Sequence, residues 1–305
     1  MAEMKLIADG LKFPEGPIAM PDGSIVLVEI ARGTLTRVTA EGKVEVIAEL
    51  GGGPNGAAIG PDGACYVCND GGFEFHEVDG ALVPGDAPAD YSGGRIERVD
   101  LKTGEFKVLY KECNGIPLNG PNDIVFDSQG GFWFTDLGKG RGRTQDRGGL
   151  YYAKIDGSMI KEVVFPITTP NGVGLSPDEK TVYVSDTIPG RLWAFDVTAP
   201  GELAPNPGPL PGRFVGSGPQ LCFFDSLAVD SEGNICVATI FNPGITVFSP
   251  DGSKITHTPT DDFMTTNICF GGKDLKTAYI TLSSSGRLVS TEWPVAGLPL
   301  NFLNK

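Results

Sequence analysis

The sequence has few of the side chains on which covalent hydrolases depend. Its 305 residues include two histidines, His76 and His257, and no Gly-x-Ser-x-Gly motif that would place a serine on a nucleophile elbow. Neither histidine can be assigned with a serine and an aspartate to a catalytic triad. His257 stands between two threonines in an expected outer strand, where a surface position is expected. A covalent serine mechanism is therefore not expected.

Long apolar runs and a surplus of positive charge are also missing. No stretch of about 18 uncharged apolar residues occurs, and no apolar run follows a basic start. With 24 Lys and Arg against 38 Asp and Glu, the formal net charge is -14, which disfavours binding to phosphate backbones and anionic lipid surfaces. We therefore expect a cytoplasmic protein that binds neither nucleic acid nor membranes.

Cysteine is too sparse for a disulfide scaffold. The chain has six cysteines, and several of them lie in apolar, strand-like runs where a reduced cysteine packs as a small hydrophobe. Cys65 and Cys68 have the spacing of a zinc-binding pair. No second pair completes such a site, and residues three apart on a strand point to opposite faces. All six are predicted to be reduced packing residues.

What the sequence does contain is an internal repeat, with no amphipathic helical stretch of ten or more residues between the copies. Each of six copies has one polar residue, here called the pivot, followed by an apolar strand, a turn and a second strand rich in β-branched and aromatic residues. The pivots are Glu15, Asn55, Asn122, Asn171, Asp225 and Asn267. They lie 40 to 67 residues apart, and the longest insertion falls between Gly71 and Gly94. The spacing predicts a single all-β domain over residues 1–305, folded as a six-bladed β-propeller.

Six equivalent pivots on the innermost strands would meet at one height around the central axis. The ring would hold two carboxylates and four carboxamides, which are the oxygen ligands of hard divalent cations. The alternative is a hydrogen-bonded network that plugs the channel, in which two neighbouring unpaired carboxylates would be costly. We therefore expect one divalent ion, Ca²⁺ first, with Zn²⁺, Mn²⁺, Mg²⁺ or Fe²⁺ as alternatives for an oxygen site.

Several motifs resemble those of the SMP-30/gluconolactonase family and occur in the right order over nearly the whole chain. They are Phe-Pro-Glu-Gly-Pro at 13–17, Asn-Gly-Pro-Asn-Asp at 119–123, Phe-Trp-Phe-Thr-Asp at 132–136, Gly-Gly-Leu-Tyr at 148–151, Asn-Gly-Val-Gly-Leu-Ser at 171–176 and Thr-Thr-Asn-Ile-Cys-Phe-Gly-Gly at 265–272. The resemblance implies a six-bladed propeller with one divalent metal and lactone-hydrolase activity. It assigns the metal ligands to Glu15, Asn171 and Asp225.

The resemblance also implies roles in catalysis and substrate binding. Asp225 is expected to be the general base, since a carboxylate on the metal can reach the attacking water. Asn122 matches the family's asparagine that faces substrate and water, and it could donate to the carbonyl oxygen or position the water. Asn55 and Asn267 are expected to bind substrate farther from the metal.

One position departs from the family pattern. Several sugar-lactone members carry an arginine two residues before the substrate-facing asparagine, where this chain has Gly120. The nearby loop offers Phe73, Phe75 and His76 as pocket walls, which suits a ring with few hydroxyl groups.

We therefore predict a metal-dependent lactonase acting on small γ- or δ-lactones. A metal-dependent esterase or phosphoesterase on the same site is one alternative, since a fold does not fix its substrate. A non-catalytic calcium-binding propeller is the other. The sequence does not indicate an oligomeric state.

Overall fold

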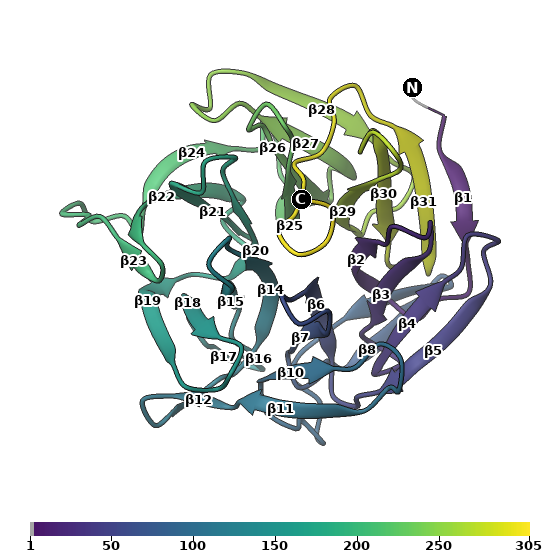
Figure 1. Cartoon of the computed structure of the whole chain (residues 1–305), viewed down its shortest axis with the longest axis horizontal. Coiled ribbons are helices and arrows are strands. Elements are labelled where there is room, and N and C mark those ends of the chain that lie inside the picture. The colour runs from purple at the N-terminus through teal and green to yellow at the C-terminus, as the bar shows by residue number, and fades with distance from the viewer. Residues whose placement is uncertain (1–2) are drawn as a thin grey trace.

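The computed structural model describes residues 3–305, and within them every regular element is a β-strand. Six antiparallel sheets are arranged like blades around a central axis (Figure 1). The prediction of an all-β, six-bladed propeller is confirmed. No helix that could cross a membrane occurs in residues 3–305.

The first three blades follow one another along the chain, and each begins with its innermost strand. Blade 1 contains β2 (Pro14–Ala19), β3 (Ile25–Glu29), β4 (Thr34–Val38) and β5 (Val44–Glu49). Blade 2 contains β6 (Pro54–Ile59), β7 (Cys65–Asn69), β10 (Arg95–Val99) and β11 (Phe106–Tyr110). Blade 3 contains β14 (Pro121–Phe126), β15 (Gly131–Asp136), β18 (Gly148–Lys154) and β19 (Ile160–Ile167).

The remaining blades repeat the pattern until the last, which both ends of the chain complete. Blade 4 contains β20 (Pro170–Leu175), β21 (Thr181–Asp186), β22 (Arg191–Ala199) and β24 (Arg213–Ser217), with the short β23 (Glu202–Leu203) beside β22. Blade 5 contains β25 (Phe223–Val229), β26 (Ile235–Ile240), β27 (Gly244–Phe248) and β28 (Ile255–Pro259). Blade 6 contains β29 (Thr265–Gly271), β30 (Thr277–Leu282), β31 (Arg287–Glu292) and, outermost, β1 (Lys5–Ala8). The antiparallel pairing of β1 with β31 closes the ring.

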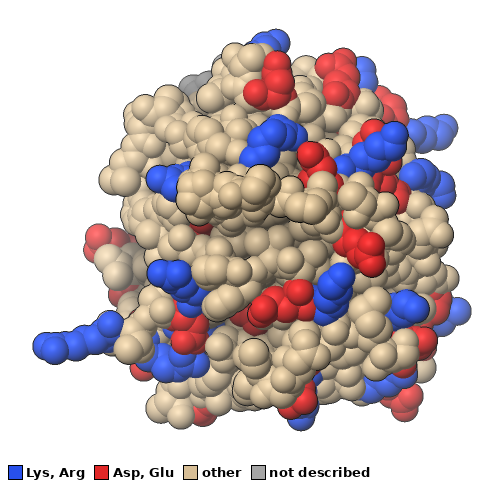
Figure 2. All heavy atoms as spheres, turned by 90° about the vertical axis from the view of Figure 1, so that its left-hand side faces the viewer, with Lys and Arg blue, Asp and Glu red and all other residues tan. Residues whose placement is uncertain are grey.

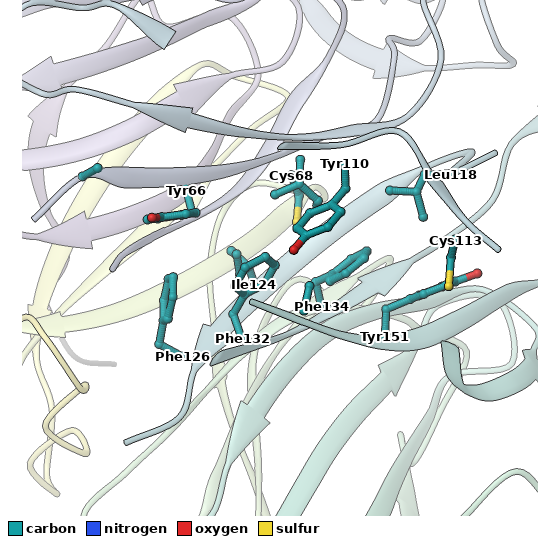
Figure 3. Packing of buried hydrophobic residues seen from close by; sticks show 13 residues of the cluster. Tyr66, Cys68, Tyr110, Cys113, Leu118, Ile124, Phe126, Phe132, Phe134 and Tyr151 are labelled. Atoms are coloured by element: carbon teal, nitrogen blue, oxygen red, sulfur yellow. The ribbon is translucent and has the colours of Figure 1, made fainter. Parts of the chain in front are cut away.

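Apolar side chains fill the space between neighbouring blades. Figure 3 shows the layer between blades 2 and 3, where the ring of Tyr66 packs on Phe126 with centroids 5.1 Å apart. In the same layer Phe134 stacks on Tyr151 at 5.1 Å. Complete burial of such a side chain contributes about 1.5–3 kcal/mol. All six cysteines are buried and free, which confirms that they are packing residues.

The two ends of the central channel differ. At one end, here called the mouth, the inner strands begin and the insertion between Gly71 and Gly94 folds into the hairpin β8 (Phe75–Val78) and β9 (Ala81–Pro84). This hairpin reaches blade 6, because the Leu82 amide donates to the Ser284 carbonyl at 2.9 Å. Four more short strands form two hairpins in other connections: β12 (Glu112–Cys113) pairs with β13 (Ile116–Pro117), and β16 (Gly140–Arg141) pairs with β17 (Thr144–Gln145).

The opposite end, here called the tail end, is covered by the C-terminal segment 298–305. Figure 1 shows this segment in yellow across the centre of the molecule. It is fixed to blade 3, since the Asn301 amide donates to the Phe126 carbonyl at 3.1 Å and the Phe302 ring packs on Phe126 at 6.1 Å. The segment therefore forms a floor across the tail end.

Charged side chains are mixed on the outer edge of the propeller. Figure 2 shows the face at the left of Figure 1, where acidic and basic residues lie interspersed without a patch of one sign. That face offers no basic surface for a nucleic-acid backbone.

Candidate metal-binding and catalytic site

All six pivots lie near the start of the innermost strand of their blade, as the repeat predicts. Each inner strand shifts register against its neighbour close to the pivot, for example between Glu15 and Ile18 and between Pro121 and Ile124. Five pivots are buried, and Asp225 alone keeps partial exposure. The inner strands of neighbouring blades contact each other all the way around the axis. The topology thus brings together residues up to 252 positions apart.

The small residue after the pivot explains how the inner strands approach so closely. A Cβ atom on Gly16 would lie 2.7 Å from the Asn55 carbonyl oxygen, and one on Gly56 would lie 2.3 Å from the Asn122 carbonyl oxygen. Only glycine has no side chain to collide there. At the three pivots that glycine follows, the missing side chain therefore allows the neighbouring inner strands to approach this closely.

Two buried oxygen atoms of the ring have no hydrogen-bond donor within residues 3–305. One oxygen of Glu15, Oε2, accepts from the Asn267 amide at 2.7 Å and from the Gly16 N–H at 2.6 Å. The other, Oε1, has no partner in that range, and neither does Asn122 Oδ1. Buried polar atoms are ordinarily satisfied. Free carboxylate and carboxamide oxygens in one narrow ring fit a hard divalent cation.

Burial makes the ring carboxylates costly to ionise. It raises the pKa of Glu15 to about 7. Burial, with a further contribution from the charge of Glu15, raises the pKa of Asp225 well above its usual range. Both shifts have the direction expected for carboxyl groups withdrawn from water beside a like charge. A bound cation would reverse them, because it favours the charged form.

The ring has too few charged ligands to hold a metal by carboxylates alone. Within residues 3–305, no group of three or more His, Cys, Asp and Glu side chains is arranged to hold a metal ion. An ion in this ring would therefore need amide oxygens as well, which Asn171 and Asn122 could supply. Asn171 Oδ1 meets one weak donor, the Ser226 hydroxyl at 3.4 Å.

Aromatic side chains line the mouth above the ring. Phe13, two residues before Glu15, packs on Phe75 with centroids 5.2 Å apart. Phe73 and Phe75 are both half-buried, at 6.5 Å from each other, in a cluster that also includes Phe223. His76 is exposed on β8, with its ring beside Gly85. The structure thus brings the two phenylalanines to the mouth and leaves His76 at the surface of the hairpin.

Comparison with known proteins places the chain in a family. A sequence model of the SMP-30/gluconolactonase/LRE-like region matches residues 13–284. The chain belongs to this family. Curated relatives include proteins named lactonase drp35 from Staphylococcus saprophyticus and from Staphylococcus haemolyticus. Each is 32% identical over 257 residues, covering 83% of this chain and 71% or 70% of the relative.

Solved structures share the fold of this family member. A calcium-binding regucalcin from Agrobacterium tumefaciens aligns with a TM-score of 0.78 at 19% identity, over 100% of this chain and 98% of the other. A gluconolactonase from Xanthomonas campestris aligns with a TM-score of 0.75 at 24% identity, over 96% and 90%. These likenesses independently support the propeller.

The family motif at positions 119–123 also contains Asp123, which the comparison of pivots alone does not identify. Asp123 is buried next to Asn122, and its carboxylate accepts from the Ile124 N–H at 2.9 Å and the Val173 N–H at 3.4 Å. Burial raises its pKa to about 7. It lines a cavity of about 120 Å³ on the tail side of the ring. The sequence does mark this position, because Asp123 follows its pivot where three other copies of the repeat have glycine.

A second missed residue is Lys139. The run Gly-Lys-Gly-Arg-Gly at 138–142 resembles a phosphate-binding loop in sequence, but no helix follows it, so the sequence alone predicts a flexible loop. In the structure the Lys139 side chain is fully buried and pairs with Asp70 at 3.0 Å. His257, in contrast, lies half-buried on outer strand β28, within 3.0 Å of the Thr246 hydroxyl.

The mouth contains a further aromatic pair, Phe223 and Phe241. Phe223 stands two residues before Asp225 on β25, and its ring meets Phe241 edge-to-face at 5.1 Å. Phe241 is 55% exposed and Leu221 78% exposed. Large exposed apolar groups beside a polar ring are typical of a binding surface. The strand period of two could have identified Phe223, because residues two apart share a face.

Proposed function

We propose that the protein is a metal-dependent lactonase, a hydrolase that acts on cyclic esters. The observation that carries the proposal is the ring of pivots with its two unpartnered buried oxygens, Glu15 Oε1 and Asn122 Oδ1. The names of the curated relatives, lactonase drp35, support the same activity.

Glu15, Asn171 and Asp225 would hold one divalent ion, with Ca²⁺ as the first choice and Zn²⁺, Mn²⁺, Mg²⁺ or Fe²⁺ as alternatives. When bound, the ion would act as a Lewis acid that polarises the lactone carbonyl. The calcium-binding regucalcin with the same fold supports the choice of a hard cation. Asn267 would orient Glu15, because its amide already donates to Oε2.

Asp225 would serve as the general base. It is the pivot with partial exposure, which would give the attacking water a route to this residue. Asp225 would take a proton from the attacking water as the water oxygen bonds to the carbonyl carbon. The same proton would go to the ring oxygen when the carbon–oxygen bond of the lactone breaks. Asn122 would position the water or donate to the carbonyl oxygen.

The mouth favours small γ- or δ-lactones with few hydroxyl groups. Phe73 and Phe75 from the β8–β9 insertion, with Phe223 and Phe241 from blade 5, offer apolar contact. Gly120 cannot take on a side chain in this backbone, because its Cβ would lie 2.5 Å from the Gly138 carbonyl oxygen. The arginine found there in several sugar lactonases is therefore excluded by the local packing. Asn55 and Asn267 would be the remaining polar contacts.

Turnover of a γ-lactone by chelated and reconstituted protein tests the proposal. We expect hydrolysis that is lost with EDTA, returns with Ca²⁺ and is absent in Asp225→Asn. A panel of lactones, linear esters and phosphoesters separates the candidates. Faster turnover of linear esters or phosphoesters would favour the alternative hydrolases, and metal binding without any turnover would leave a calcium-binding propeller.

A further inference from the structure

A buried lysine stands next to the ring without touching it. Lys139 lies in the connection between β15 and β18 of blade 3, and its side chain is 0% exposed. Its ammonium group donates to Asp70 Oδ1 at 3.0 Å and to the Gly72 carbonyl at 2.8 Å. The nitrogen also lies 3.2 Å from the centroid of the Phe73 ring. A buried ammonium is costly unless it is paired and hydrogen-bonded, and here every direction of the group is occupied.

Asp70 connects the lysine to a pivot. Its second oxygen, Oδ2, accepts from the Asn55 amide nitrogen at 3.1 Å. Its first oxygen also accepts from the Gly72 N–H at 2.7 Å. The chain of contacts therefore runs from a loop of blade 3, through the end of β7 in blade 2, to the inner strand β6.

The contact with Asp70 bears on which way the Asn55 carboxamide points. A carboxamide has a donor end and an acceptor end that an asparagine can exchange by rotating about its last bond. An ionised carboxylate only accepts hydrogen bonds, so Asp70 selects the nitrogen of Asn55 as long as it stays ionised. The Asn55 oxygen is then directed away from Asp70.

The ion pair is poorly explained by stability alone. Replacing a buried ion pair by apolar residues is often neutral or stabilising. A second largely buried pair lies in blade 2. Arg95, which pairs with Glu97 at 2.6 Å, donates to the Leu50 and Gly51 carbonyls between blades 1 and 2, and Glu97 accepts from the Asn69 side chain; neither residue hydrogen-bonds a pivot. This pair provides a matched comparison for a purely structural pair.

We propose that Lys139 is a positioning residue that, through Asp70, holds the Asn55 carboxamide with its oxygen facing the channel. The inference rests on the proposed function for its effect on turnover, but the orientation of Asn55 can be tested without turnover. Asn55 then offers an acceptor to a donor group on the substrate or to the attacking water.

A double-mutant cycle tests the coupling. Lys139→Met keeps the length of the side chain and removes the charge, and Asn55→Ala removes the carboxamide. If Lys139 acts through Asn55, each variant lowers kcat/KM for a γ-lactone by about 10-fold or more, and the double variant is no worse than the more damaging single one. Multiplying losses would overturn the proposal. Arg95→Met should leave kcat and KM unchanged.

An NMR measurement reads the orientation directly. The side-chain amide signal of Asn55, assigned by its absence in Asn55→Ala, should exchange slowly with solvent because it donates to a carboxylate. Lys139→Met should speed that exchange about 10-fold or more, while Arg95→Met should not change it. Lys139→Arg, which keeps the charge, serves in its place if Lys139→Met does not fold, and should preserve the slow exchange. Unchanged exchange in Lys139→Met, or loss of it in Lys139→Arg, would overturn the inference. Absence of all lactone turnover in the wild type would overturn the proposed function instead.

Discussion

Replacing Glu15 by glutamine separates the electrostatic cost of the ring from its capacity to hold a cation. Glutamine keeps the size of the side chain and removes its negative charge. Burial raises the pKa of Glu15 from 4.5 to about 7, and one pKa unit corresponds to about 1.4 kcal/mol. Without a cation at pH 8, ionised Glu15 therefore lowers the free energy of unfolding by about 3 kcal/mol.

The pH dependence has a definite sign. Because the folded pKa lies above the unfolded one, the folded protein binds more protons, and stability falls as pH rises from about 4.5 to about 7. Between pH 5.5 and pH 8 the chelated wild type should lose about 2 kcal/mol through Glu15. Glu15→Gln lacks this loss. The chelated variant should therefore be more stable than chelated wild type at pH 8, with a smaller difference at pH 5.5.

Urea unfolding in EDTA and in Ca²⁺ measures both effects. The pH range stays above 5.5, since the sequence pI is about 4.6 and solubility is lowest there. In Ca²⁺ the order should reverse, because the variant has lost half of the ring's negative charge. Glu41→Gln, at an exposed position, is the matched control and should show no such pH-dependent difference. A chelated Glu15→Gln protein less stable than chelated wild type at pH 8 would refute the reasoning.

Three other changes have distinct expected results. Asn122→Ala should retain calcium affinity by calorimetry but lower kcat by about 10- to 1,000-fold, the range for one oriented polar group; full activity would remove Asn122 from the mechanism. Phe241→Ser should lower kcat/KM for a γ-lactone with an alkyl chain and leave the unsubstituted ring unaffected, as steady-state kinetics would show. The unmodified protein should prefer the alkyl lactone over gluconolactone, corrected for spontaneous hydrolysis. Deleting residues 298–305 should lower the free energy of unfolding by about 2 kcal/mol or more, because Leu298 and Leu303 pack on the blades.

The repeat made the fold and the ring predictable from sequence. A pivot such as Asn171 is recognisable because five other copies share its setting, and radial symmetry then places all six around one axis. The contact between Lys139 and Asp70 lies outside the repeat, in two insertions of unrelated sequence. Nothing in the local pattern of either segment shows that they meet, since the pair is 69 positions apart. Its formation depends on how blade 2 docks against blade 3.

The orientation of the individual side-chain amides could not be predicted from the sequence either. Asn55 and Asn267 look alike in the repeat, yet the first donates to Asp70 and the second to Glu15. The difference comes from neighbours on other strands. The prediction of His76 as a pocket wall rested on its loop being near the mouth, and the β8–β9 hairpin turns that side chain outward to solvent.

The floor that the C-terminal segment forms across the tail end has a kinetic consequence. A propeller channel open at both ends would let a reactant enter on one side and the hydroxy acid leave on the other. Leu298, Asn301 and Leu303 close one side of the cavity beneath the ring. The lactone must therefore enter, and the hydroxy acid must leave, through the mouth. A hydroxy acid that has not yet departed blocks the next lactone. Product should therefore inhibit competitively with respect to substrate, and progress curves should slow before the substrate is consumed.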